Sequence, residues 1–296
     1  MNVSSPAVPP YRPPADAPDW FRENLRHPGE SRYATLNDRA VHFLTWNWEQ
    51  VDWPTLLFVH GFSGHAHWWS FLVPFFTDRY RVVAIDLPGM GDSAAQPEYS
   101  DECFARGILA VVEQHRIAAP ILIGHSFGGG QSIRAMGLAP ERFQRGIVVD
   151  SLVRFSPEPS APLIEGRTSH RLHPTREACL ERFRLSPPQP DADPCLVEFV
   201  AHHSCTRSEG GWHWKFDPGL RNFGEIKDTV LQQKVRARVD CIYGELSMFT
   251  SDNRPRRILE TFPNAGELVI VPGAYHHLML DRPLQLVAAI KGLLAG

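Results

Sequence analysis

The sequence predicts an α/β fold, in which a doubly wound, mostly parallel sheet is interrupted by an inserted helical cap. Short apolar runs alternate with helical stretches along most of the chain, which is typical of a parallel sheet covered by helices on both faces. One interval of almost ninety residues breaks this rhythm, and a structureless loop of that length is improbable in a compact domain. The length of 296 residues suits one such domain with an insertion.

The predicted strands are continuous apolar runs, because a strand that is buried on both faces needs no polar alternation. These runs cover residues 40–46, 55–59, 81–85, 120–123, 146–149, 239–243 and 267–271. Helices are expected between most of them, for example at 100–116 and 128–139. In such a fold the functional site lies at the carboxyl ends of the strands.

The domain boundaries follow from composition. Residues 1–18 are rich in proline and serine and hold few apolar anchors, so we expect a flexible arm. Residues 19–150 and 236–296 form the predicted core. The intervening residues 151–235 form the predicted helical cap, inserted after the sixth strand.

Composition and charge argue against several classes of function. The formal net charge is -3 and no basic run exists, so neither nucleic acid nor an anionic membrane is an expected partner. No apolar run approaches the ~20 residues of a membrane-spanning helix. The five cysteines form no paired motif, which favours reduced thiols in a cytoplasmic protein. We therefore expect a cytoplasmic protein that acts on a small-molecule substrate, with a homodimer left open.

The strongest motif is Gly124-His125-Ser126-Phe127-Gly128, which directly follows a predicted strand. The pattern G-x-S-x-G between a strand and a helix is the context of a nucleophile elbow, a tight turn that lifts the serine hydroxyl clear of the sheet. The positions two residues on either side must be small for the turn to close. The helix that follows aims its N-terminal dipole at any negative charge formed there. Ser126 is therefore the predicted nucleophile.

Acyl transfer on a serine also needs two backbone N–H groups that face the oxyanion of the tetrahedral intermediate. The residue after the nucleophile, Phe127, offers one of them. The loop that follows Leu57-Phe58-Val59-His60-Gly61 offers the other, and Phe62 is the predicted donor. Only the backbone acts here, so the side chains are free to vary.

Two adjacent histidines follow the last predicted strand, in the run Pro272-Gly273-Ala274-Tyr275-His276-His277. Acyl transfer needs a general base that takes the proton of the serine and returns it to the leaving group. A histidine late in the chain suits the order serine, acid, histidine. From these residues alone, either histidine can serve.

Together these motifs resemble the α/β-hydrolase superfamily, in the serine-nucleophile branch with a helical cap, from about residue 20 onward. The resemblance rests on the elbow, the His60-Gly61-Phe62 loop, the strand and turn at 84–93 and the histidine loop. In that family the catalytic histidine stands seven residues before a proline. The resemblance therefore implies His276, seven residues before Pro283, as the base. It also implies that the 84–93 stretch serves turn formation and packing.

The acid departs from the family's pattern. Members usually carry it in a Gly-Glu-x-Asp motif, where this chain reads Gly244-Glu245-Leu246-Ser247. Some members, including a group similar to haloalkane dehalogenases, supply the acid one strand earlier. That strand is followed here by Asp150. The resemblance therefore favours Asp150, with Asp252, Glu245 or no acid left as alternatives.

Four aromatic residues are predicted to line the substrate pocket: His65, Trp68, Trp212 and Trp214. His65 and His67 have a two-residue spacing, but no carboxylate or cysteine joins them, so no metal is expected. No cofactor is expected either. Apolar cap residues such as Phe183, Leu185 and Phe199 predict an apolar acyl group of limited size.

The predicted reaction is acyl transfer to water through an acyl-enzyme on Ser126, with an apolar ester, thioester or lactone as substrate. Hydrolysis of a C–C bond in a diketone is also compatible with a serine in this fold. Two further alternatives stay open because a fold does not decide the chemistry. One is a cofactor-free lyase or oxygenase that uses His276 as its base, and the other is a small-molecule receptor that signals through movement of the cap.

Overall fold

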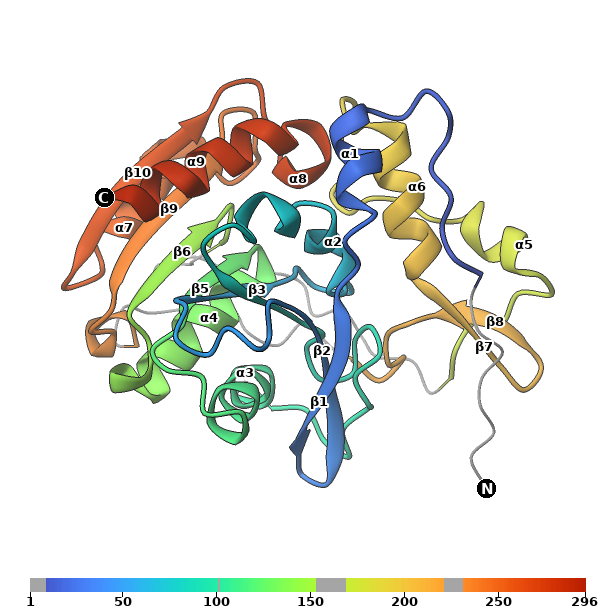
Figure 1. Cartoon of the computed structure of the whole chain (residues 1–296), viewed down its shortest axis with the longest axis horizontal. Coiled ribbons are helices and arrows are strands. Elements are labelled where there is room, and N and C mark those ends of the chain that lie inside the picture. Colours follow the sequence, from blue (N-terminus) through green and yellow to red (C-terminus); the bar gives the residue numbers. More distant parts are fainter. Residues whose placement is uncertain (1–8, 101, 153–168, 221–230) are drawn as a thin grey trace.

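The structure, a computed structural model, describes residues 9–100, 102–152, 169–220 and 231–296. Its centre is an eight-stranded sheet in the order β1-β2-β4-β3-β5-β6-β9-β10 (Figure 1). The strands are β1 (Glu30–Leu36), β2 (Arg39–Trp46), β3 (Thr55–Val59), β4 (Arg81–Ile85), β5 (Ile121–His125), β6 (Arg145–Val149), β9 (Arg238–Gly244) and β10 (Ala265–Val271). Strand β2 runs antiparallel to β1 and β4, and all other neighbours are parallel. The predicted α/β fold with a mostly parallel sheet is confirmed.

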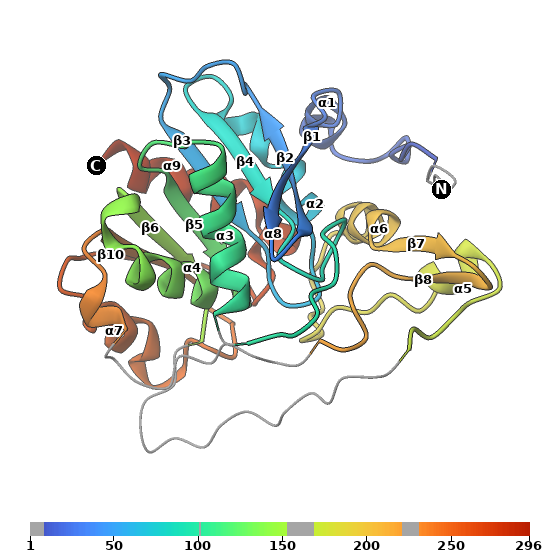
Figure 2. The ribbon, with the colours of Figure 1, turned by 90° about the horizontal axis from the view of Figure 1, so that it is seen from below.

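Helices cover both faces of the sheet (Figures 1 and 2). One face carries α3 (Cys103–Gln114), α4 (Phe127–Leu138) and α7 (Arg254–Leu259), and the other carries α1 (Asp19–Asn24), α2 (His67–Ser70), α8 (Leu278–Asp281) and α9 (Pro283–Ala295). Short 3₁₀ turns lie at Val73–Phe76, Pro140–Arg142, Gln232–Lys234 and Ser251–Asn253. No helix in the described part of the chain is both long enough and apolar enough to cross a membrane.

Two apolar cores explain why the central strands are apolar along their whole length. Successive side chains of a strand point to opposite faces. In β3, Leu57 and Val59 therefore join one core, whereas Leu56 and Phe58 join the other. All five residues of β3 are buried, so the period-2 alternation of a half-exposed strand is absent from the sequence.

Strand β1 is an element that the apolar runs do not predict. Most of its residues are polar, and only Ala34 is buried, because β1 lies at the edge of the sheet. It pairs with β2 through a turn at Asn37 and Asp38, which both have positive φ angles of 50° and 58°. Two positive φ angles are typical of the tight turn that matches the twist of a β-hairpin.

The described part of the predicted N-terminal arm, residues 9–18, contacts both α1 of the core and α6 (Pro194–His203) of the cap. The Tyr11 ring contacts Phe21 and Phe199, with ring centroids 6.4 Å and 5.2 Å apart. The Tyr11 hydroxyl donates to the carbonyl oxygen of Cys195 at 3.3 Å, and Ala17 is buried. The Tyr11 side chain thus ties this proline-rich stretch to α1 and α6. Residues 1–8 lie outside the described residues.

The described part of the cap, residues 169–220, mixes helices and strands. It holds α5 (Arg176–Leu180), α6 (Pro194–His203), β7 (Cys205–Ser208) and β8 (Gly211–Trp214). The hairpin β7–β8 is a separate two-stranded sheet that stands beside the core (Figure 1). The helical prediction holds for α5 and α6 and misses this hairpin, which contains the aromatic run of the cap. Residues 153–168 and 221–230 of the predicted cap lie outside the described residues.

A histidine stack joins α6 of the cap to α2 of the core. The rings of His67 and His203 are nearly parallel, with centroids 3.7 Å apart. Burial lowers the pKa of His67 to about 4. Burial and the neighbouring His67 also lower the pKa of His203. Both rings are therefore neutral at neutral pH, and the two can stack without charge repulsion.

Acid should weaken the fold through this stack. An unfolded histidine binds a proton near pH 6.5, whereas folded His67 does so only near pH 4. The unfolded state therefore holds more protons between these values, and the free energy of unfolding should fall as the pH falls from about 6.5 to about 4. The slope is about 1.4 kcal/mol per pH unit for each such histidine. Urea unfolding at pH 7.5, 6 and 5 measures it.

Substitution of His67 separates the stack from other acid-sensitive groups. The variant His67→Gln should show a smaller loss of unfolding free energy between pH 7.5 and 5 than the native chain. The matched control is His27→Gln, because His27 is exposed on the surface. Equal pH slopes for the native chain and the His67 variant would rule out the stack as the sensitive element.

Candidate active site

The elbow has the strained geometry that its sequence predicts. Ser126 stands between β5 and α4 with φ 53° and ψ -122°, a conformation that L-residues rarely adopt. Its neighbours must be small, because a Cβ atom on Gly128 would lie 2.3 Å from the carbonyl oxygen of His60. A Cβ atom on Gly124 would lie 2.5 Å from Ser132 Oγ. The turn presents Ser126 to a cavity at the carboxyl ends of the strands.

A carboxylate and a histidine meet beside this cavity. Asp150 directly follows β6, and its Oδ1 accepts a hydrogen bond from His276 Nδ1 at 2.8 Å. Asp150 has no exposed surface, and the His276 side chain is 5% exposed. Asp150 stands in the left-handed region with φ 45°, which aspartate tolerates better than most residues. Of the two histidines, the structure brings His276 into contact with the acid.

The other two acid candidates lie apart from this pair. Asp252 is exposed in the 3₁₀ turn Ser251–Asn253. Glu245 is also exposed, and its Oε2 accepts a hydrogen bond from the backbone N–H of Gly273 at 2.8 Å. That bond ties the loop after β9 to the loop after β10. Glu245 therefore stabilises these loops and, within the described residues, forms no hydrogen bond with His276.

Ser247 is a residue of the site that sequence reasoning passed over. Its Oγ donates a hydrogen bond to Asp150 Oδ1 at 2.5 Å, while the N–H of Gly244 donates to Asp150 Oδ2 at 2.8 Å. The signal was available, because Ser247 occupies the position of the usual acid in Gly-Glu-x-Asp. The side chain at this sequence position thus contacts the Asp150 carboxylate.

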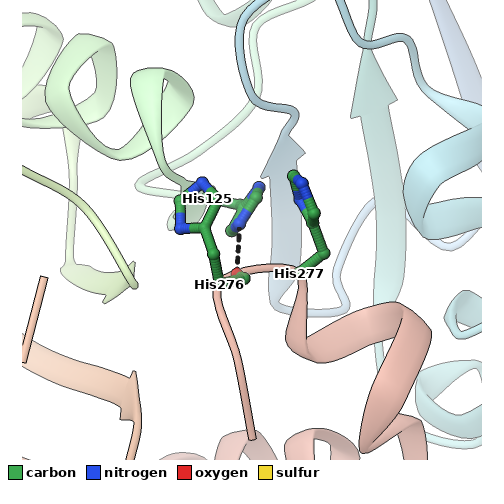
Figure 3. A group of neighbouring side chains, drawn as sticks. All are labelled: His125, His276 and His277. Atoms are coloured by element: carbon green, nitrogen blue, oxygen red, sulfur yellow. Dashed lines mark hydrogen bonds between the residues drawn. The ribbon is translucent and has the colours of Figure 1, made fainter. Parts of the chain in front are cut away.

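Three buried histidine rings gather at the floor of the cavity (Figure 3). His125 Nε2 donates to the carbonyl oxygen of His276 at 2.9 Å, which fixes the histidine loop against the elbow. Burial lowers the pKa of His125 and lowers that of His277 to about 3, so both rings are neutral. His125, His276 and His277 each offer a ring nitrogen within 4.8 Å of the others, which are donors that can hold a transition metal. The sequence, which pointed only to His65 and His67, does not predict this group.

The two predicted oxyanion donors face the same cavity. Phe62 and Phe127 both line it, and their rings meet edge to face with centroids 5.3 Å apart. Among the described residues, no acceptor pairs with the backbone N–H of either one. These N–H groups can therefore donate to a ligand in the cavity without breaking an existing hydrogen bond.

The cavity has a volume of about 830 Å³, which is in the range of small-molecule sites. Of the predicted pocket residues, His65, Trp68 and Trp214 line it. Trp212 is not among the described residues that line it. Trp212 and Trp214 share one face of β8, but Trp212 pairs with Arg207 two residues farther along the hairpin. Two residues of a strand span about 6.6 Å, which is enough to leave the cavity.

The cap contributes more than apolar surface to the cavity. Phe183 and Leu185 line it as predicted, whereas Phe199 instead packs against Phe21 and Phe71. Four cationic residues line the cavity that sequence reasoning did not single out: Arg171, Arg182, Arg184 and Lys215. Their pattern in the sequence is irregular, so only the fold shows that they face one space.

Comparison with known proteins agrees with this architecture. A model of the alpha/beta hydrolase family matches residues 56–290. The chain is 26% identical over 269 residues to Esterase Rv0045c of Mycobacterium tuberculosis, covering 86% of each chain. The crystal structure of that esterase superposes with a TM-score of 0.69 at 21% identity, over 94% of this chain and 97% of the other.

A second solved structure has the same fold. It is that of E-2-(acetamidomethylene)succinate hydrolase, with a TM-score of 0.72 at 20% identity over 90% of this chain and 100% of the other. At that identity the likeness concerns the fold alone. The family model, by contrast, matches the sequence itself from β3 into α9, a range that includes the elbow, Asp150 and the histidine loop. The chain therefore belongs to the alpha/beta hydrolase family of enzymes.

Proposed function

We propose that this enzyme hydrolyses a carboxylic ester, thioester or lactone with an apolar acyl portion through an acyl-enzyme on Ser126. One observation carries the proposal. The buried Asp150 binds His276 Nδ1 at 2.8 Å, and His276 lines the same cavity as Ser126 in its strained elbow. A nucleophile, a base and a group that orients the base are the three parts that acyl transfer on serine requires.

The proposed mechanism assigns one role to each group. Asp150 holds His276 in the tautomer with the proton on Nδ1, so Nε2 takes the proton of Ser126 as Oγ attacks the substrate carbonyl. The N–H groups of Phe62 and Phe127 stabilise the resulting oxyanion. His276 then gives its proton to the leaving group, and the acyl-enzyme forms. A water molecule, activated by the same histidine, releases the acid and restores Ser126.

The relatives support an ester as the substrate class. Rv0045c, which aligns over 86% of the chain, is named an esterase. The walls near Ser126 are suited to an apolar acyl group, because Phe62, Trp68 and Phe249 line this cavity. Burial of such surface contributes about 25 cal/mol per Å² of apolar area.

Covalent labelling tests the proposal. A fluorophosphonate should add one phosphonyl group to the chain, on Ser126, and should abolish turnover of p-nitrophenyl esters of two to eight carbons. Mass spectrometry of the labelled peptide locates the group. If the treated chain keeps its turnover, the reaction does not pass through an acyl-enzyme on Ser126. The alternative, a lyase or oxygenase that uses His276 as a base without a covalent intermediate, then replaces the proposal.

Ser247 should support catalysis without taking part in the chemistry. In Ser247→Ala, Asp150 loses one of its three donors but keeps its bonds to Gly244 and His276. A hydrogen bond to a charged group is worth about 1.5–3 kcal/mol, so we expect kcat to fall by about 10- to 100-fold. The variant Ser247→Thr keeps the hydroxyl and should restore most of the activity. Steady-state kinetics on a p-nitrophenyl ester measures both, and an unchanged kcat in Ser247→Ala would contradict this role.

A further inference from the structure

The charged residues of the cavity are all of one sign. Among the described residues that line it, the cations are Arg171, Arg182, Arg184 and Lys215, and there is no aspartate or glutamate. Lys215 is already paired, since its Nζ lies 2.7 Å from Asp92 Oδ1. Arg171, Arg182 and Arg184, which we call the arginine rim, form no ion pair with a carboxylate in the described part of the chain. The rim therefore carries positive charge that the protein itself does not neutralise there.

Two of the rim residues are held in place by their neighbours. Along 182–185 the exposure alternates, with Arg182 and Arg184 exposed and Phe183 and Leu185 half-buried. Phe183 and Leu185 pack against the apolar core of the face that carries α9, and Phe183 lies 6.0 Å from the Trp214 ring. Arg182 and Arg184 alternate with these anchored residues, and both line the cavity. Arg184 also donates to the carbonyl oxygens of Glu181 and Phe183, at 2.8 Å and 2.7 Å.

The lining around Ser126 differs in character from this rim. Burial lowers the pKa values of His125 and His277, so these rings carry no charge at neutral pH. The Phe249 ring meets His276, and Phe62 packs against Phe127, the residue after Ser126, so all three phenylalanines supply apolar surface to the cavity there. The cavity thus combines an apolar and imidazole floor around Ser126 with a cationic rim on the cap.

We propose that the substrate carries an anionic group, a carboxylate or a phosphate, at the end remote from its scissile ester or thioester bond, and that the arginine rim binds this group. The inference rests on the function proposed above and narrows its substrate class. Guanidinium groups bind carboxylate and phosphate oxygens through paired hydrogen bonds. The apolar floor then holds the part of the substrate next to the reacting carbonyl. The substrate is accordingly amphiphilic rather than simply apolar.

Matched substrate pairs test the anionic group directly. For carboxylate, p-nitrophenyl hydrogen glutarate is compared with p-nitrophenyl pentanoate, because both have five-carbon acyl groups. For phosphate, butanoyl-4′-phosphopantetheine is compared with butanoyl-pantetheine. We expect kcat/KM to be at least about tenfold higher for the anionic member of one pair, mainly through a lower KM. A charge-assisted hydrogen bond to the anion is strong enough to give a difference of this size. The preferred pair identifies the anion, and equal values in both pairs overturn the proposal.

Charge variants locate the preference. The double variant Arg182→Gln/Arg184→Gln should bring the ratio of kcat/KM values for the preferred pair close to one. A rise in KM rather than a fall in kcat is expected, because the rim binds ground state and transition state alike. The control is Arg207→Gln, an exposed arginine of the same cap that does not line the cavity. If the preference for the anionic substrate survives in the double variant, the rim does not cause it. The same conclusion holds if Arg207→Gln removes the preference equally.

A binding measurement separates this inference from the proposed reaction. Calorimetric titration of Ser126→Ala with the anionic and neutral substrates reports affinity without turnover. The rim predicts at least about tenfold tighter binding of the anionic member, lost when Arg182→Gln and Arg184→Gln are added. If this holds while fluorophosphonate fails to label the native chain, the proposed reaction is wrong and the rim stands. If the native chain is labelled but the anionic and neutral members bind with equal affinity, the proposed role of the rim is wrong and the proposed reaction stands.

Discussion

Ser126→Ala should lower kcat on a p-nitrophenyl ester by on the order of 10⁶-fold, the size of effect found when a serine nucleophile is removed from such a catalytic unit. Alanine keeps the Cβ atom and the backbone strain at φ 53°, so the substitution removes the hydroxyl and little else. His276 and Asp150 then remain in place but have no nucleophile to activate. Steady-state kinetics with high enzyme concentration measures the residual rate.

Two controls make this result interpretable. Thermal unfolding of Ser126→Ala should match that of the native chain, which shows that the loss is chemical. Ser208→Ala changes an exposed serine of strand β7 by the same substitution and should leave kcat as it is. Hydrolysis by Ser126→Ala at the native rate would refute the acyl-enzyme mechanism.

Asp150→Asn should lower kcat by about 10⁴-fold, as loss of the orienting aspartate does in other serine triads. Asparagine has nearly the same shape and also tolerates the left-handed backbone at φ 45°, so the fold should persist. Its amide nitrogen, however, is a donor. The bonds from Gly244 and Ser247 favour an acceptor at both oxygens of residue 150, so the amide must break one of its bonds or impose the wrong tautomer on His276.

The matched comparison is Asp252→Asn, which makes the same change at an exposed turn position. It should alter kcat by less than about twofold, because surface substitutions away from a site have small effects. The two variants are measured on the same ester at the same pH. The reverse ranking would move the acid to the loop after β9 and would leave the Asp150–His276 bond as a structural feature.

The elements with a local signal could be predicted from the sequence alone. Apolar runs revealed the buried strands because these face apolar cores on both sides. The spacing G-x-S-x-G revealed the elbow because a tight turn from strand to helix needs small residues at these fixed positions. The seven-residue spacing to Pro283 also singled out His276 through the family resemblance. These features depend on neighbours close in the chain or on one repeating environment, so they can be seen without a structure.

Contacts between residues that are distant in the chain could not be predicted from the sequence and became visible only in the tertiary structure. Nothing local shows that Ser247 binds Asp150, that Tyr11 anchors the N-terminal arm on α6, or that Trp212 stands just beyond the cavity. The same holds for the arginine rim, because only the fold brings Arg171 to the cavity that Arg182 and Arg184 line. Charge and hydrogen bonding act through space, and the sequence records only neighbours along the chain. Which side chains share a cavity is therefore settled by the fold.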